Sequence, residues 1–194
     1  MFELRNLPRA TPTLLYAGRV SREKGVLDLP EVFQWVRKVI PNIRIRVAGN
    51  GPALKKLRRQ LPEAEYLGWI GEGAMKEAYL QADMLLLPSR FDTFGCVVLE
   101  ALATGLPVAA YRSKGPADII EHEQQGYLSD SPTEMASHVV KYLTTSEIEQ
   151  KRMQRLAQDR LQAYQAKDIL HKLLVTTGID KETDNPEIQL NHVG

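Results

Sequence analysis

Short apolar runs alternate along the chain with longer segments in which apolar residues recur every three or four positions. A short, unbroken apolar run that stops at proline, such as DMLLLP at 83–88, is typical of a strand buried on both faces. The other short runs predict strands at 13–17, 43–49, 66–70 and 107–111. The longer segments predict a helix that carries Glu100 and ends at Gly105, and further helices at 26–40, 54–61 and 74–82.

Strands and helices that alternate at this spacing predict an α/β fold, a Rossmann-like doubly wound parallel sheet with helices on both faces. From Ala117 onward only helical patterns appear, so we expect a helical carboxyl-terminal segment to follow the sheet. We expect residues 1–178 to form one domain. Residues 179–194 are polar and lack an apolar period, which predicts a disordered or peripheral tail.

Composition restricts the classes of function. Of the 194 residues 43% are hydrophobic, and a formal net charge of +1 gives no general attraction to nucleic acid. The single cysteine, Cys96, cannot form an intrachain disulfide and favours a reducing compartment. The first residues lack the apolar core of a signal peptide, and no apolar stretch has the length of a membrane span. We therefore expect a cytoplasmic protein, with a peripheral position at a membrane left open.

Candidate binding residues follow the first predicted strand. In open parallel sheets, ligands bind beyond the carboxyl ends of the strands. Gly18 and Arg19 come directly after this strand, and Lys24 and Gly25 follow a short polar turn. Glycine lets the backbone approach a ligand, and two cations can converge on an oxyanion or pyrophosphate.

A second candidate group follows the buried strand DMLLLP. Ser89, Asp92 and Gly95 lead into a helix whose amino terminus suits a phosphate or a sugar hydroxyl. Glu100 lies about one and a half turns into this helix, in the apolar run VVLEALA. A carboxylate there is tolerable if it faces a ligand crevice and accepts two hydrogen bonds from a vicinal diol such as that of a ribose.

The same residues resemble a known family. The segments LLYAGRVSREKG, VAGNGPALKKL, YLGWI, AYLQADMLLLPSRFDTFGCVVLEALATGLPVAA and KGPADII resemble, in order, the donor-binding carboxyl-terminal domain of family 4 glycosyltransferases (glycosyl transferases group 1). The resemblance runs from about residue 13 to residue 128. It implies that this chain is one half of a two-domain GT-B fold.

The resemblance also implies roles for individual residues. The family's signature is two acids with seven residues between them, a spacing that Asp92 and Glu100 share. It assigns the donor sugar to Asp92, the ribose to Glu100 and the donor diphosphate to Arg19 and Lys24. Asp92 stands where the family usually has glutamate, so its carboxylate reaches toward the donor sugar on a side chain that is one methylene shorter. The further donor-binding residues that we expect are Gly18, Asn50, Gly51, Trp69, Ile70, Ser89, Phe94, Gly95 and Cys96.

The implied reaction is transfer of a hexose, with retention of configuration, from a UDP- or GDP-sugar to an acceptor. The sequence contains no Asp-x-Asp pair and no residue cluster with metal-ligand spacing, so we expect neither a metal nor another cofactor. Family members carry an amino-terminal acceptor domain, but this chain begins almost at the first strand of the donor half. We therefore expect that domain to be missing from this chain and supplied in cis or in trans. A lipid-linked acceptor and a role in polysaccharide or glycolipid biosynthesis are compatible with the resemblance.

Other interpretations stay open. Glu100 could be an ordinary helix acid, Asp92 could only cap the following helix, and Cys96 could be a small packing residue. The basic helix face Lys55, Lys56, Arg58 and Arg59 is typical of a solvated surface but could meet anionic lipid. The four histidines show no metal spacing. The motif AGNGPAL lacks the third glycine and the later acidic residue of a dinucleotide site. Alternative functions are a non-catalytic nucleotide-sugar-binding or regulatory module and, with less support, a nucleotide-sugar epimerase.

Overall fold

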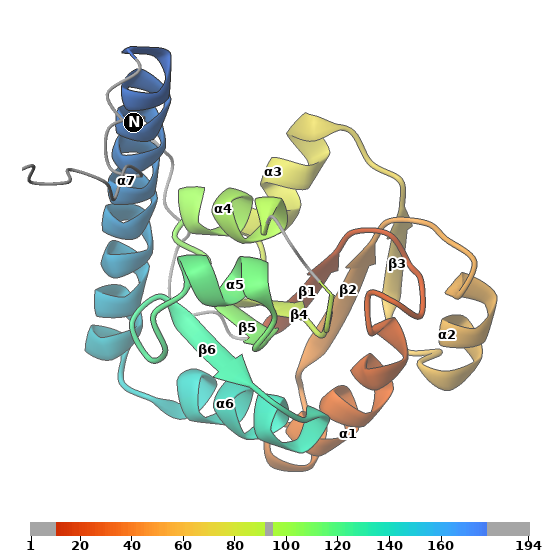
Figure 1. Cartoon of the computed structure of the whole chain (residues 1–194). Helices are drawn as coiled ribbons and strands as arrows, with labels where there is room; N and C mark the ends of the chain where they lie inside the picture. Colours follow the sequence, from red (N-terminus) through yellow and green to blue (C-terminus); the bar gives the residue numbers. More distant parts are fainter. Residues whose placement is uncertain (1–10, 92–94, 178–194) are drawn as a thin grey trace, which may run out of the picture. The chain divides into compact units, whose positions relative to one another are not determined.

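The computed structural model describes residues 11–91 and 95–177. These residues form a six-stranded sheet in the order β3-β2-β1-β4-β5-β6, in which every neighbouring pair is parallel (Figure 1). The strands are β1 (Thr13–Ala17), β2 (Arg44–Ala48), β3 (Glu65–Gly68), β4 (Met84–Leu87), β5 (Val108–Tyr111) and β6 (Gly126–Ser129). The predicted doubly wound parallel sheet is confirmed.

Helices cover both faces of this sheet. Figure 1 shows α3, α4 and α5 along one face and α1 and α6 along the other. The helical elements are η1 (Val26–Asp28), α1 (Leu29–Val39), α2 (Leu54–Gln60), α3 (Glu72–Leu80), α4 (Cys96–Ala103), α5 (Lys114–Ile119), α6 (Pro132–Thr144) and α7 (Glu147–Thr177). Connections between parallel strands are right-handed, so the direction in which the chain crosses the sheet decides which face the connecting helix covers. Helices on both faces therefore require the chain to cross the sheet in both directions.

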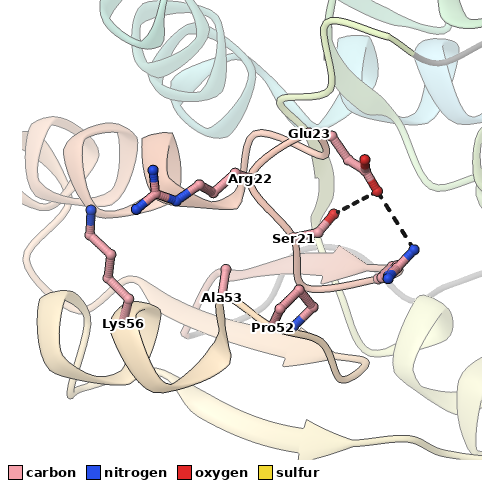
Figure 2. Close-up of a pocket in the computed structure, with 7 residues that line it drawn as sticks. Ser21, Arg22, Glu23, Pro52, Ala53 and Lys56 are labelled. Carbon is pink, nitrogen blue, oxygen red and sulfur yellow. Dashed lines mark hydrogen bonds and ion pairs between the residues drawn. The ribbon is translucent and has the colours of Figure 1, made fainter.

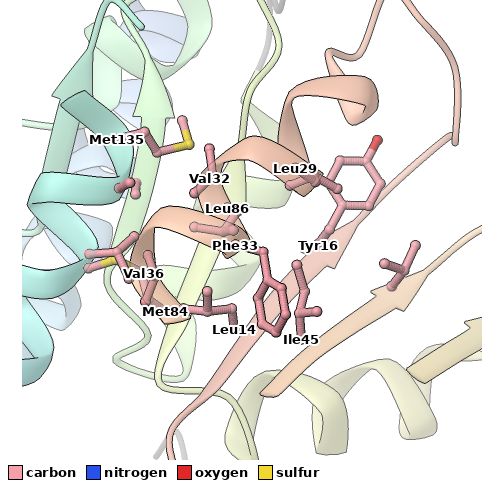
Figure 3. Close-up of a cluster of buried hydrophobic side chains, with 14 of the residues drawn as sticks. Leu14, Tyr16, Leu29, Val32, Phe33, Val36, Ile45, Met84, Leu86 and Met135 are labelled. Atoms are coloured by element: carbon pink, nitrogen blue, oxygen red, sulfur yellow. The ribbon is translucent and has the colours of Figure 1, made fainter. Parts of the chain in front are cut away.

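The main hydrophobic core lies between the sheet and the layer formed by α1 and α6. Figure 3 shows Leu14 and Leu86 from adjacent strands close to Phe33 and Val36 of α1 and Met135 of α6. Each of these five side chains is at most 2% exposed. Burying a side chain of this size contributes roughly 1.5–3 kcal/mol relative to leaving it in water. This packing holds the strands together, so that their carboxyl ends lie along one edge of the sheet.

The strand β6 contradicts the expectation that only helical patterns follow Ala117. Its sequence, GYLS, has neither an apolar run nor a clear alternation, so its pattern does not indicate a strand. The strand is nevertheless fully buried beside β5. A Cβ at Gly126 would lie 2.2 Å from the carbonyl oxygen of Val108, so the close approach of the two strands requires the glycine.

The carboxyl-terminal end of α5 is fixed by an arginine from the first half of α7. The Nε of Arg160 donates to the carbonyl of Ile119 at 2.7 Å, and its guanidinium also forms an ion pair with Glu121 at 3.0 Å. The last carbonyls of a helix have no partner within the helix, and a cation there also interacts favourably with the helix dipole. Arg160 therefore ties α5, which packs beside α4, to the rest of the domain.

The chain divides into two compact units, residues 1–161 and 162–194. The sheet and all helices up to the first half of α7 belong to the first unit, and the second begins within α7. Residues 178–194, which include the predicted tail, lie outside the described residues, so the predicted boundary at 178 stays a prediction. None of the helices in the described part of the chain has both the length and the apolar character that crossing a membrane would require.

Candidate functional site

The order of the strands reverses between β1 and β4. The loop 18–25 after β1 and the loop that begins at residue 88 after β4 therefore leave the sheet at its switch point, where open α/β sheets bind ligands. The two loops touch at Gly25, which has a φ of 67°. A Cβ at this position would lie 1.7 Å from the carbonyl oxygen of Pro88. A glycine is required here both by the left-handed conformation and by the contact.

Backbone hydrogen bonds join the loops after β1 and β2 to each other and to the ends of β2 and β3. The N–H of Gly18 donates to the carbonyl of Ala48 at 3.0 Å, and the N–H of Gly49 donates to the carbonyl of Gly68 at 2.7 Å. The N–H of Val20 then donates to the carbonyl of Asn50 at 2.9 Å. These bonds continue the pairing of the strands beyond the ends of β1 and β2, so the loops after β1 and β2 and the end of β3 form one continuous surface.

Two of the predicted residues, Gly18 and Asn50, belong to this surface, and a third, Gly51, lies beside it. Gly51 packs against the loop after β1, because a Cβ there would lie 2.3 Å from the carbonyl oxygen of Val20. The structure therefore brings these three residues together from two different loops.

A cavity of about 520 Å³ opens between α3 and α4. It has the volume of a typical small-molecule site. Its lining includes two of the predicted residues, Ile70 from the segment after β3 and Glu100 from α4, although they are 30 positions apart in the sequence. The other residues that line it are Glu72, Met75, Lys76, Tyr79, Ala103 and Thr104. Trp69, next to Ile70, is 80% exposed.

The carboxylate of Glu100 is exposed and has a partner that sequence reasoning did not identify. The hydroxyl of Tyr79, on α3, donates to Oε2 of Glu100 at 2.7 Å. Tyr79 is itself only 3% exposed. Burial and the hydrogen bond to Glu100 raise the pKa of Tyr79 far above its usual range, so the phenol keeps its proton and remains a donor. The bond fixes one carboxylate oxygen and leaves the other available to a ligand.

The two predicted cations of the first loop lie apart from this cavity. Arg19 lines a different cavity, of about 470 Å³, and pairs with Glu23 at 3.7 Å, with both side chains more than 60% exposed (Figure 2). Lys24 is half-buried, and its backbone N–H donates to the carbonyl of Ser21 at 3.2 Å. The loop is further held by the hydroxyl of Tyr16, which donates to the carbonyl of Arg19 at 2.7 Å.

Two buried serines stand at the ends of adjacent strands. Ser89, which was predicted, follows β4 and is fully buried, and Ser113, which was not, follows β5 and is 6% exposed. Neither hydroxyl has a hydrogen-bond partner among the described residues. An unsatisfied buried hydroxyl costs roughly 1–3 kcal/mol. Unpaired polar groups at this edge favour a polar ligand over a purely structural role.

The start of α4 is fitted closely to α5. Gly95, the residue before α4, has a φ of 63°, and a Cβ there would lie 2.6 Å from the Cδ1 of Ile119. Cys96, the first residue of α4, is exposed, so the interpretation of its thiol as a packing group is wrong. The predicted Asp92 and Phe94 lie outside the described residues.

Sequence reasoning also missed a cluster near the switch point that consists of Asp28, Arg90 and Tyr111. The hydroxyl of Tyr111, at the end of β5, donates to Oδ2 of Asp28 at 2.7 Å. Arg90 forms an ion pair with Asp28 at 3.7 Å and lies over the ring of Tyr111 at 4.4 Å. Arg90 directly follows Ser89, so its place after β4 was the one signal that could have drawn attention to it.

Comparisons with known proteins identify the family of this chain. Residues 3–160 match the sequence profile of the family described as glycosyl transferases group 1. A curated relative, sulfoquinovosyl transferase SQD2 from Arabidopsis thaliana, is 36% identical over 118 residues, which are 59% of this chain and 22% of the relative. The chain therefore spans less than a quarter of that relative.

Solved structures show the same fold. One is the C-terminal domain of a glycosyl transferase group 1 family protein, LpcC, from Francisella tularensis, with a TM-score of 0.71 and 20% identity over 78% of this chain and 85% of that one. Another is HepE from Anabaena in complex with UDP and glucose, with a TM-score of 0.71 and 18% identity over 84% of this chain and 48% of that one. Because the family profile covers most of its length, the chain belongs to the glycosyl transferases group 1 family.

Proposed function

We propose that this chain is the nucleotide-sugar-binding half of a retaining hexosyltransferase, working with an amino-terminal acceptor domain in the same chain or in a partner. The observation that carries the proposal is the cavity between α3 and α4, in which the exposed carboxylate of Glu100 is held by Tyr79 and faces a lining that includes Ile70. A carboxylate with one free oxygen suits the diol of a ribose, and the exposed backbone segment at Trp69 and Ile70 suits the base.

The proposed chemistry is leaving-group stabilisation. The bond between the anomeric carbon and the diphosphate breaks, the acceptor oxygen bonds to the anomeric carbon on the same face of the sugar, and the proton of the acceptor hydroxyl passes to the departing diphosphate. Arg19 and Lys24 would stabilise the negative charge that develops on the nucleoside diphosphate, together with the amino terminus of α4. Asp92 would contact the donor sugar. Because two cations serve the diphosphate, we propose that the reaction needs no metal. A UDP-sugar is the first donor to test, since the similar structure of HepE contains UDP and glucose.

Calorimetric titration with UDP, GDP and ADP in the absence of metal tests the proposal. We expect one of the three to bind and the other two to bind at least tenfold more weakly, because the base contacts select among them. Failure of all three to bind the folded chain would contradict it. If a nucleotide binds but adding an amino-terminal half in trans yields no transfer, the alternative of a non-catalytic binding module is favoured.

Replacing Tyr79 with phenylalanine should weaken nucleotide binding about 3- to 10-fold, because the loss of one hydrogen bond, worth roughly 0.5–1.5 kcal/mol, leaves Glu100 free to rotate. The free energy of unfolding should change little, since phenylalanine keeps the buried ring. Tyr66→Phe is a matched control, because the hydroxyl of Tyr66 donates to the carbonyl of Leu61 at 2.9 Å and lines neither cavity. Equal affinities for Tyr79→Phe and the unaltered protein would argue against a positioning role.

A further inference from the structure

The cavity that contains Arg19 is also lined by two further cations, Arg22 and Lys56, which have no role in the proposed donor site. It lies between the loop after β1 and the start of α2, and it is lined by Arg19, Ser21, Arg22, Glu23, Pro52, Ala53 and Lys56. Figure 2 shows Arg22 and Lys56 extending from the two sides of the cavity toward the same end of it. The nucleoside cavity at Glu100 shares none of these residues.

The residues that line this cavity include more cations than carboxylates. Its one carboxylate, on Glu23, is already engaged by Arg19 at 3.7 Å and by the hydroxyl of Ser21 at 3.3 Å. Within residues 11–91 and 95–177, neither Arg22 nor Lys56 forms an ion pair or hydrogen bond with another side chain. Two cations that face one cavity repel each other unless an anion joins them.

We infer that this cavity binds a phosphate monoester, with the phosphate held between Arg22 and Lys56. A phosphate monoester carries nearly two negative charges at pH 7, which two cations balance. The guanidinium of Arg22 can bind two of its oxygens at once, and the amine of Lys56 supplies a compact charge. Since Arg22 is exposed and Lys56 is half-buried, solvent screens the attraction and the affinity is modest.

The rest of the cavity indicates what the phosphate is attached to. Its volume of about 470 Å³ is far larger than a phosphate group. At the other end, Glu23 and Ser21 present a carboxylate and a hydroxyl that can bond hydroxyl groups, over a floor that includes Pro52. This arrangement fits a phosphorylated polyol or sugar, either free or as a lipid headgroup. The use of such a ligand as the acceptor rests on the proposed function, but its binding does not.

The test compares two double variants that remove the same charge. Arg22→Gln/Lys56→Gln removes both cations of the cavity. Lys55→Gln/Arg59→Gln removes two exposed cations of α2 that do not line it. Calorimetry with sn-glycerol 3-phosphate, in the absence of nucleotide, should show binding to the unaltered protein and none of glycerol. We expect the cavity variant to bind roughly tenfold more weakly or worse, and the surface variant to change by less than about threefold.

Vesicles identify the source of the phosphate. If phosphatidylcholine vesicles that contain phosphatidic acid bind the protein and sn-glycerol 3-phosphate displaces them, the ligand is a headgroup. If only the soluble ester binds, the ligand is free. The inference is overturned if the unaltered protein does not bind the ester, or if both variants lose binding equally, since attraction to the whole basic surface would then explain it. Titration with the nucleoside of whichever nucleotide the unaltered protein binds keeps the two proposals separate, because the cavity variant should bind that nucleoside as the unaltered protein does.

Discussion

Replacing Glu100 with alanine should weaken binding of the selected nucleotide by about 1.5–3 kcal/mol, or roughly 10- to 100-fold. The substitution removes the carboxylate that would accept both hydroxyls of the ribose in the cavity between α3 and α4. The measurement is calorimetric titration of the folded variant, with thermal unfolding to show that the fold is kept. Because the substitution leaves the hydroxyl of the buried Tyr79 without its acceptor, we also expect the free energy of unfolding to fall by roughly 1–3 kcal/mol, a loss that still leaves a folded protein to titrate.

Two further variants sharpen this test. Glu100→Gln keeps an acceptor oxygen for Tyr79 but removes the charge, so its affinity should lie between those of the alanine variant and the unaltered protein. Glu77→Ala removes an acid from an exposed position of α3 that does not line the cavity, and it should bind as the unaltered protein does. If Glu100→Ala and Glu77→Ala bind nucleotide equally well, the ribose role of Glu100 is wrong.

Replacing Gly25 with alanine should lower the free energy of unfolding by roughly 3 kcal/mol, because it combines an unfavourable left-handed conformation with a clash against the backbone of Pro88. For a domain of this size, that loss corresponds to a fall in the unfolding temperature of about 10 °C. Denaturant unfolding at constant temperature measures it. Nucleotide binding should weaken as well, since Lys24 precedes Gly25 and would move with the displaced loop.

Gly73 provides the matched control for this substitution. It lies in α3 and is exposed, and a Cβ there would meet no atom of the described residues within 4 Å. Alanine in place of glycine within a helix stabilises by roughly 0.5–1 kcal/mol, so the same chemical change should have the opposite sign here. Equal stability of the Gly25→Ala variant and the unaltered protein would show that the loops after β1 and β4 can separate without cost.

The class of fold could be predicted because its signals are local. Buried parallel strands need apolar residues on both faces, and LLYA in β1 and MLLL in β4 show this directly. The strand β6 could not be predicted, because GYLS is buried by its neighbours rather than by its own apolar pattern. The order of the strands could not be predicted from the sequence either, because the right-handed crossover rule does not say on which side of β1 a later strand will pair.

Some residues of the candidate site could also be predicted from the sequence, and others could not. Residues after strands, such as Gly18 and Ser89, could be proposed from the sequence because the carboxyl ends of parallel strands meet at one edge. The hydrogen bond from Tyr79 to Glu100 could not, because a tyrosine in a partly apolar helix gives no sign of where its hydroxyl points. Ser113 was missed for a similar reason, since only the fold shows that its hydroxyl is buried beside the end of β4.

The hydrogen bonds that hold the loops after β1 and β2 affect the entropy that a ligand must overcome when it binds. Loops that are free before binding must be ordered by the ligand, at a cost in conformational entropy of about 1–2 kcal/mol for each residue fixed. Here the N–H groups of Gly18 and Gly49 are already bonded to the ends of β2 and β3, and that of Val20 is bonded to the loop after β2. At these positions the ordering is completed when the domain folds, so a ligand that contacts these two loops need not fix them at its own entropic cost.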